Sequence, residues 1–337
     1  MPNSAPMQFS VVIPTYNRAA LIGETIEAVL AQSLPAGEII VVDDGSTDDT
    51  QSALQRFAGA INVIRICNSG DLVARNTGLR AARARLVAFC DSDDLWQPHL
   101  LARMSEFFER APGLTAAYSD FRLLTGGELS CTTKFDEAPA TFWHGACQVA
   151  DGMLVYDAPI VDKLLDCQLL FPSCMTADRE RFLHIGGWDE GVSRIVGCDF
   201  ATVLRVGATK PLGLLHEPLV SIRKHASNFS GNVEAMNLGD ARVLEYVLSR
   251  RQELAPLEAA IRDSVASRRR SAMASAFVRQ DFGAVREIDR LIPRTHRPLA
   301  HRLKAAVATL PPPLAYLAAN ALSRLASRRA RVAEHSH

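Results

Sequence analysis

The sequence predicts an α/β fold, in which a largely parallel sheet has helices on both faces and a helical C-terminal region follows. Two observations support this class. Short β-branched apolar runs alternate with helical patterns up to residue 91, as in sheets whose parallel strands are joined by helices. Beyond residue 235 the chain is rich in Ala, Leu and Arg and shows no strand pattern.

The expected elements follow one another in a regular order. Strands are expected at residues 9–14, 38–44, 61–67 and 86–91, and helices around 19–32, 48–58 and 71–83. An apolar run at 114–124, an irregular stretch to about 160, an α/β portion at 169–190, a helix at 198–207 and an apolar run at 212–222 come next. We therefore expect one domain over 1–233, with halves 1–113 and 114–233, and a helical region over 234–337.

The balance of charge differs between the two ends of the chain. The 37 Lys and Arg residues equal the 37 Asp and Glu residues overall. Residues 1–239, however, hold 19 basic and 28 acidic residues, whereas residues 240–337 hold 18 and 9. The body therefore carries a formal charge of −9 and the tail one of +9, so the tail is either a solvated helical face or has an anionic partner.

Three features indicate a cytoplasmic protein. The cysteines number seven, which is odd, and form no CxxC pair, which favours reduced thiols. The N-terminus has neither a basic segment nor a long apolar stretch, so we expect no signal peptide. Residues 305–323 are uncharged, but the prolines at 311–313 interrupt them, and we expect no membrane-spanning helix.

Several common enzyme motifs are missing from the sequence. No GxGxxG follows the first expected strand, no Gly-Lys dipeptide occurs, and neither HExxH nor GxSxG is present. The chain is therefore not expected to be a nicotinamide enzyme, a P-loop NTPase, a zincin or an α/β-hydrolase.

Acidic residues follow two of the expected strands, at the edge where open α/β sheets bind their ligands. Asp91-Ser92-Asp93-Asp94 ends one strand, and its carboxylates suit a hard cation, Mg²⁺ or Mn²⁺, that also binds a diphosphate. The alternative is that Asp94 caps the helix expected near Pro98.

The second acidic strand end is Asp43-Asp44-Gly45-Ser46. A carboxylate here can accept a hydrogen bond from the ring N–H of uracil or thymine, and Gly45 permits a close approach of the backbone. Capping of the next helix by Asp48 or Ser46 is the alternative, but it does not account for Asp44. Two acidic ends at one sheet edge favour a ligand site over packing.

These segments resemble the inverting nucleotide-sugar glycosyltransferases of family 2, which have the GT-A fold. The matching segments are VVIPTYNR (11–18), VVDDGSTDDT (41–50), NSGDLVARNTGL (68–79) and AFCDSDDLWQPHLL (88–101). Weaker matches follow at 185–190 and 221–225. The resemblance is close over about the first 110 residues and implies a GT-A type, Rossmann-like domain.

The resemblance implies roles for residues around the donor. Pro14 and Tyr16 would line the nucleobase pocket, Asp44 would hold the edge of the pyrimidine, and Arg75 would approach the diphosphate. Trp188, in the weaker match, either stacks on a sugar ring or is buried.

The resemblance also implies a metal site. Asp91 and Asp93 match the DxD motif of the family, with Asp93 favoured as the direct ligand of Mn²⁺ or Mg²⁺. His225 matches an Arg-x-His element whose His completes the metal shell. The alternative is that His225 is an ordinary core or surface histidine.

The catalytic base is the least certain assignment that the resemblance gives. Family members usually carry it in a Glu-Asp pair, and the matching place here reads Cys198-Asp199. Asp199 is therefore the expected base, with Asp189 and Glu190 as substitutes. A helix cap is the other role open to Asp199.

Together these residues predict a metal-dependent, inverting glycosyltransferase of the hexosyltransferase type. It would move a sugar from a nucleoside-diphosphate donor, with a UDP-sugar expected, to a hydroxyl of a glycan or lipid-linked acceptor in cell-envelope polysaccharide assembly. Loops between 114 and 185 would face the acceptor. The alternative is a nucleotide-sugar-binding or nucleotidyltransferase-like protein of similar fold without transferase activity.

The C-terminal tail is expected to lie at the inner face of the cell membrane, through residues 296–331. Apolar residues at 314, 317, 318, 321, 322 and 325 form a helical stripe, and Arg324, Arg328, Arg329 and Arg331 follow. Such a helix suits an anionic lipid surface. Nucleic acid is not expected, because the body is acidic and the tail lacks interleaved aromatic residues. The alternative is that the stripe packs against the body or a second subunit.

Overall fold

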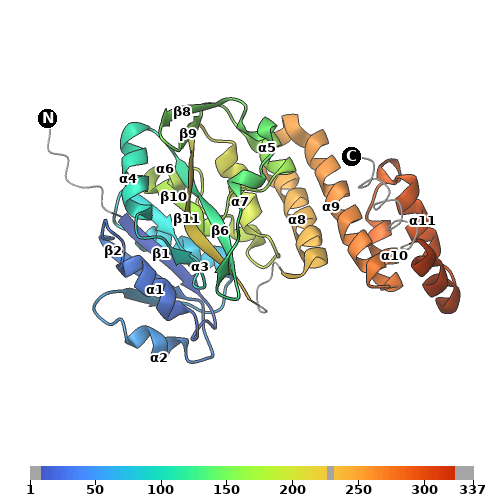
Figure 1. The fold of residues 1–337 in the computed structure, drawn as a ribbon, viewed down its shortest axis with the longest axis horizontal. Coiled ribbons are helices and arrows are strands. Elements are labelled where there is room, and N and C mark those ends of the chain that lie inside the picture. Colours follow the sequence, from blue (N-terminus) through green and yellow to red (C-terminus); the bar gives the residue numbers. More distant parts are fainter. Residues whose placement is uncertain (1–8, 226–230, 323–337) are drawn as a thin grey trace. The chain divides into compact units, whose positions relative to one another are not determined.

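The computed structural model describes residues 9–225 and 231–322, which form two compact units (Figure 1). One, the sheet unit, contains residues 9–194 and 198–225. The other, the helical unit, contains Ile195–Gly197 and residues 231–322. No helix in the described ranges is long and apolar enough to span a bilayer.

A single mixed sheet runs through the sheet unit. Its strands in the described residues are β1 (Phe9–Thr15), β2 (Glu38–Asp43), β3 (Asn62–Arg65), β4 (Leu86–Phe89), β5 (Leu95–Trp96), β6 (Ala116–Thr125), β7 (Glu128–Leu129), β8 (Ala146–Ala150), β9 (Met153–Tyr156), β10 (Met175–Asp178) and β11 (Leu212–Lys224). They lie in the order β3-β2-β1-β4-β10-β6-β11-β9-β8, while β5 pairs with β11 and β7 with β6.

The four strands expected from the first half of the sequence form the parallel part of this sheet. Strands β3, β2, β1 and β4 are parallel neighbours, and Val12 of β1 is in register with Ile40 of β2 and Phe89 of β4. Beyond β4, β10 is antiparallel to both β4 and β6, whereas β6 and β11 are parallel. The predicted α/β fold is confirmed, and antiparallel strands enlarge its sheet.

Helices cover this sheet. They are α1 (Ile22–Leu30), α2 (Thr50–Gln55), α3 (Asp71–Ala81), α4 (Leu100–Arg110), α5 (Val161–Asp166), α6 (Arg179–His184) and α7 (Asp199–Gly207). Helix α3 packs directly on β1, because a Cβ atom on Gly78 would lie only 2.4 Å from Cγ1 of Val12. This close packing fixes the first turn of α3 beside the carboxyl ends of β1 and β4.

The helical unit has its own apolar core. Its helices are α8 (Val233–Arg250), α9 (Glu258–Val278), α10 (Phe282–Arg290) and α11 (Leu299–Val307), followed by a helix over 312–322. Met273, Phe277, Val285 and Ile288 are among the buried residues that hold α9 and α10 together. The predicted helical character of the C-terminal region is therefore correct for the described residues.

Candidate donor and metal site

Three loops at the carboxyl ends of the parallel strands are bonded to one another. Asn17, which follows β1, has a positive φ of 51° and accepts a hydrogen bond at Oδ1 from the backbone N–H of Thr47 (2.8 Å). Its own backbone N–H donates to Oγ of Ser46 (2.9 Å). The loops after β1 and β2 are thereby held side by side, at the edge where the sequence predicts a ligand.

Asp44, which follows β2, is hydrogen-bonded to the loop after β3. Its carboxylate oxygens accept from the backbone N–H groups of Ser69 (2.7 Å) and Gly70 (2.8 Å). Gly45 has a φ of +78°, and a Cβ atom there would lie 2.9 Å from the backbone nitrogen of Asn68. The close approach expected at Gly45 is thus made by the protein's own backbone. Because each carboxylate oxygen can accept a second hydrogen bond, the role of Asp44 toward a nucleobase stays a prediction.

The two residues expected beside the nucleobase follow from the end of β1. Pro14 is buried within the strand, in register with Val42. Tyr16, directly after the strand, is 43% exposed. The tyrosine ring is therefore accessible at the same edge as Asp44, as a wall of a nucleobase pocket would have to be.

Arg75 is a buried cation held between two carboxylates. Its Nε donates to Asp71 (3.1 Å), one helical turn earlier on α3, and its Nη2 donates to Asp91. Burial alone would lower its pKa, but Asp71 and Asp91 raise it, so the guanidinium stays charged. Its Nη1 is buried and has no hydrogen-bond partner among the described residues. Nη1 carries two N–H bonds, so it has donors left for an anion such as a diphosphate.

Trp188 lies against the guanidinium of Arg75. The indole is 1% exposed, and the guanidinium carbon of Arg75 lies 4.9 Å from its ring centroid. Phe89 and Phe182 meet the same ring edge-on, with centroids 5.0 and 5.7 Å away. The alternative that Trp188 stacks on a sugar is therefore wrong, because its faces are occupied by the protein core.

The three aspartates of the DSDD segment have different surroundings. Asp94 is buried and accepts from Oγ of Ser173 and from the backbone N–H of Arg223 (2.9 Å). It does not cap a helix: it ties this loop to β11 and to the short 3₁₀ helix Pro172–Cys174. Burial raises the pKa of Asp91 to about 6, and Asp71 and Asp93 add to the rise while Arg75 opposes it.

Asp93 is the DSDD carboxylate that lies beside His225. Its Oδ2 is 3.0 Å from Nε2 of His225, so the structure brings together two predicted metal ligands that are 132 positions apart in the chain. The same oxygen lies 3.3 Å from Nε of Arg18. Asp91, the third predicted ligand, is turned toward Arg75 instead.

Asp93 and His225 can be compared with the ligands that Mg²⁺ and Mn²⁺ prefer. In the described part of the chain, no three His, Cys, Asp or Glu side chains gather around one ion position. The carboxylate suits such a cation when substrate phosphates and water supply the other ligands, which is the usual arrangement for Mg²⁺. The imidazole is a nitrogen ligand, which transition-metal ions accept more readily than Mg²⁺ does. Asp93 and His225 therefore fit the metal as a two-residue site completed by a diphosphate.

The three candidate bases differ in what holds them. Asp189 is buried and accepts from Nη2 of Arg205 (2.6 Å), while Glu190 accepts from Asn76 and Arg80 (2.7 Å each). Asp199 is the first residue of α7 and is half-buried. Asp189 and Glu190 are thus held by ion pairs, and Asp199 stays the predicted base.

Cys198 cannot replace the missing acid as a charged group. Burial raises the pKa of its thiol, and the neighbouring carboxylates of Asp199 and Asp71 raise it further. The thiol is therefore neutral near pH 7.

The buried Arg205–Asp189 pair leads to a stability prediction. Both side chains are less than 10% exposed, at 7% and 6%. Breaking a buried ion pair leaves an uncompensated charge, so Asp189→Asn should destabilise the protein by about 3–5 kcal/mol. Urea unfolding followed by circular dichroism measures this change. An unfolding free energy equal to that of the wild type would show that the pair contributes nothing.

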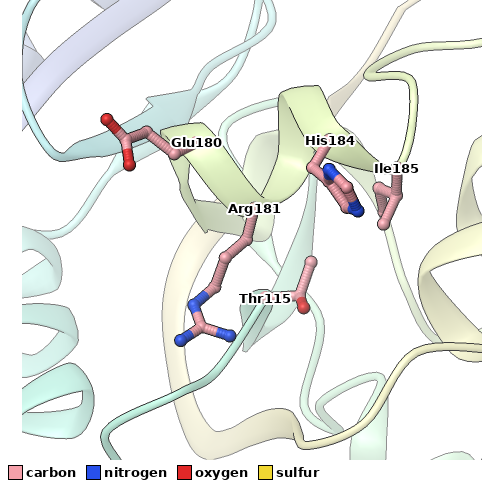
Figure 2. Close-up of a pocket in the computed structure, with 5 residues that line it drawn as sticks. All are labelled: Thr115, Glu180, Arg181, His184 and Ile185. Atoms are coloured by element: carbon pink, nitrogen blue, oxygen red, sulfur yellow. The ribbon is translucent and has the colours of Figure 1, made fainter.

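A separate surface pocket does not coincide with this site. Thr115, Glu180, Arg181, His184 and Ile185 line it (Figure 2). Thr115 lies just before β6, which runs in the same direction as β4, so the pocket is at the opposite edge of the sheet from Asp93. The candidate site is therefore defined by the strand-end residues and not by this pocket.

Asp71 and Arg18 are two residues of the site that the sequence analysis did not assign, although signals for them were present. Asp71 and Arg75 are spaced i, i+4 on a helix, which is the spacing of a side-chain ion pair. Arg18 stands within the VVIPTYNR segment itself. No local pattern, however, shows that Arg18 reaches Asp93, because that contact joins two different strand ends.

Comparison with known proteins shows that this chain is similar to glycosyltransferases. Residues 10–121 match the model of Glycosyl transferase family 2. TuaG of Bacillus subtilis, named for teichuronic acid biosynthesis as a glycosyltransferase, is 43% identical over 172 residues, which are 50% of this chain and 62% of TuaG. The UDP-Glc:alpha-D-GlcNAc-diphosphoundecaprenol beta-1,3-glucosyltransferase WfaP of Escherichia coli is 37% identical over 103 residues, 30% of this chain and 41% of WfaP. The chain thus spans less than two thirds of either relative.

Solved structures agree in fold. The crystal structure of S. aureus TarS 1-349 in complex with UDP-GlcNAc has a TM-score of 0.59 to this chain, covering 94% of this chain and 92% of that one, at 16% sequence identity. The match of residues 10–121 confirms the resemblance seen in the sequence. Residues 10–121 thus form a domain of the glycosyl transferase family 2 type, and the fold is of the GT-A type.

Proposed function

We propose that this protein is a metal-dependent, inverting hexosyltransferase that moves a sugar from a UDP-sugar to an acceptor hydroxyl in cell-envelope polysaccharide assembly. The observation that carries the proposal is the meeting of Asp93 and His225 at the strand edge that also holds the buried cation Arg75. A carboxylate can hold the cation of a metal-bound diphosphate, an imidazole can add a nitrogen ligand to that cation, and a guanidinium binds phosphate oxygens.

The names of similar proteins support the donor and acceptor classes. WfaP is named for a UDP-linked glucose donor and a diphosphoundecaprenol-linked acceptor, and TarS was crystallised with UDP-GlcNAc. TuaG is named for teichuronic acid biosynthesis. We therefore infer a UDP-sugar as donor and a glycan or lipid-linked hydroxyl as acceptor.

The chemistry is a single displacement at the anomeric carbon. Asp199 takes the proton of the acceptor hydroxyl as its oxygen bonds to the anomeric carbon on the face opposite the diphosphate. The bond from that carbon to the diphosphate oxygen breaks, and the configuration is inverted. Arg75 donates to the departing diphosphate through Nη1. A divalent cation on Asp93 and His225 would supply further charge stabilisation for the leaving group.

A nucleotide-sugar-binding protein without transferase activity is the second candidate. The observation that favours it is Cys198, a half-buried neutral thiol where the family usually has an acid. Both candidates bind the donor, but only the enzyme breaks the bond between the sugar and the diphosphate. Release of UDP therefore separates them.

A thermal-shift screen tests the donor class. Sugars linked to UDP, dTDP and GDP are each added with Mn²⁺, and a donor that binds only the native state raises the melting temperature. We expect the UDP-sugars to give the largest shift. A larger shift with GDP-sugars would contradict the assignment of a pyrimidine to the pocket beside Asp44.

We also propose that the protein is cytoplasmic and binds the inner face of the cell membrane through its helical unit. The predicted stripe is divided in the structure: Ala318 and Leu322 pack against the core of this unit, whereas Leu314 and Leu317 are 53% and 68% exposed. Leu299 on α11 is 70% exposed. The exposed leucines are apolar side chains that a lipid surface can bury.

The positive charge of the tail is partly neutralised within the helical unit. The pairs are Arg262–Glu258, Arg268–Asp240, Arg269–Glu245, Arg279–Glu234 and Arg297–Asp289. Arg324, Arg328, Arg329 and Arg331, which the sequence analysis assigned to the membrane contact, lie outside the described residues, as does residue 325. The membrane proposal therefore rests on the exposed leucines and on the basic sequence that follows them.

Co-sedimentation with vesicles of phosphatidylcholine and phosphatidylglycerol at low salt tests this proposal. Leu314→Ser combined with Leu317→Ser should weaken binding at least about tenfold, because burying one leucine contributes roughly 1.5–3 kcal/mol. Val278→Ser, at an apolar residue of α9 that is 74% exposed, is the matched control and should bind like the wild type. Equal sedimentation of all three proteins, or none by the wild type, would reject the membrane contact.

A further inference from the structure

Two side chains, those of Arg18 and His225, share a single oxygen of Asp93. Oδ2 of this carboxylate lies 3.3 Å from Nε of Arg18 and 3.0 Å from Nε2 of His225. The pair is sheltered, since the side chains of Arg18 and Asp93 are 22% and 14% exposed. Arg18 therefore sits on the oxygen that would bind the metal in the proposed function.

The backbone of Arg18 is fixed while its side chain can change partner. Its N–H donates to Oγ1 of Thr50 (2.9 Å), and its Nη1 donates to the carbonyl of Asn17 (3.3 Å). Among the described residues, the guanidinium thus contacts one carboxylate and one neighbouring carbonyl. Rotation about the side-chain bonds can move it without any change in the loop.

A guanidinium and a divalent cation that bind the same carboxylate oxygen repel each other. Arginine stays protonated at every physiological pH, so its charge repels a metal ion that approaches Oδ2 of Asp93. A diphosphate changes this balance, because phosphate oxygens are good partners for the planar N–H groups of arginine. Once Arg18 binds the phosphate, Asp93 becomes available to the metal.

We infer that Arg18 couples the metal to the donor: it holds Asp93 until a nucleoside diphosphate arrives, then transfers to the phosphate and releases the carboxylate. The inference rests on the proposed function in one respect, that Asp93 binds the cation. It goes beyond that function in making Arg18 a donor-binding residue and in giving the metal a low affinity for the protein without nucleotide.

Titration calorimetry of Mn²⁺ binding, with and without saturating UDP, tests the inference without any measurement of turnover. In the wild type, UDP should raise the affinity for Mn²⁺ by about 5- to 150-fold, the range typical of coupled sites. Arg18→Met should bind Mn²⁺ more tightly than the wild type when UDP is absent, and the effect of UDP should shrink. Arg18→Lys, which keeps the charge, should retain weak Mn²⁺ binding without UDP.

Arg83→Met is the matched control. Arg83 also pairs with a carboxylate of the sheet unit, Glu38 (2.9 Å), but at the start of β2, away from the strand ends that hold Asp93. This variant should behave like the wild type in both titrations. Melting temperatures of all variants confirm that each is folded.

The outcomes separate this inference from the proposed function. Mn²⁺ binding that is equally tight in the wild type and in Arg18→Met without UDP would overturn the inference and leave the metal site standing. Failure of every folded protein to bind Mn²⁺, with UDP present, would overturn both.

Discussion

Replacing Asp93 by asparagine is expected to abolish sugar transfer while the protein stays folded. Asparagine has the same shape but lacks the negative charge that a divalent cation requires. A metal ion contributes several kcal/mol to stabilising a departing phosphate, so kcat/KM should fall by about 10²- to 10⁴-fold. The measurement is the release of UDP from a UDP-sugar with Mn²⁺, together with calorimetric titration of Mn²⁺ in the presence of UDP.

The control for Asp93→Asn is an aspartate of the same unit outside the site. Asp157, an exposed residue just after β9, can be changed to asparagine without loss of any contact described above. That variant should keep wild-type turnover and Mn²⁺ affinity. Full activity of Asp93→Asn in excess EDTA would contradict the metal assignment.

Replacing Asp199 by asparagine is expected to remove the chemical step but not the binding of the donor. Loss of a general base typically lowers the rate by about 10²- to 10⁴-fold, and asparagine can still begin α7. The fall should therefore appear in kcat, with the dissociation constant for UDP little changed. Steady-state kinetics and calorimetry on the same preparation separate the two quantities.

Asp162→Asn is the control for Asp199→Asn, because Asp162 also lies in the first turn of a short helix, α5. Its kcat should equal that of the wild type. The assignment of the base would be wrong if Asp199→Asn were active while folded Glu190→Gln bound UDP without turnover. Inactivity of Asp189→Asn would count only if that protein were as stable as the wild type, since Asp189 pairs with the buried Arg205.

The strand ends were predictable because they depend on short stretches of sequence. Alternating apolar runs located β1, β2 and β4 to within two residues, and parallel strands bring their carboxyl ends to one edge. Asp44 and Asp93 follow from that rule. The meeting of Asp93 with His225 came from the family resemblance, since no periodicity connects residues so far apart.

Tertiary contacts decided the features that the sequence left open. Trp188 is an aromatic residue in a polar neighbourhood, and only the packing of Phe89 and Phe182 shows that it is core. Asp94 is the same type of residue as Asp93 and lies in the same loop, yet it is hydrogen-bonded to Ser173 and to the backbone of β11. In each case the local sequence identifies the residue, but its contact partner lies in a distant part of the chain, which no local pattern reveals.

The C-terminal helices also have features that could not be predicted from local sequence. An apolar stripe in the sequence does not reveal which of its residues pack inward, and here Ala315 and Ala319, next to the predicted positions, are the most buried. Charge counting also overstated the free positive charge, because arginines such as Arg268 are paired with carboxylates from other helices of the unit. Net charge describes a segment but not its pairing.

The measurement that tests the central claim most directly is hydrolysis of a UDP-sugar by the full chain, followed as release of UDP with Mn²⁺, without an added acceptor. Water then takes the place of the acceptor hydroxyl, so the assay requires no knowledge of the natural glycan. The account predicts release that depends on Mn²⁺ and is lost in EDTA and in Asp93→Asn. Tight binding of UDP-sugars with no release from any of them would contradict it and identify a nucleotide-sugar-binding protein.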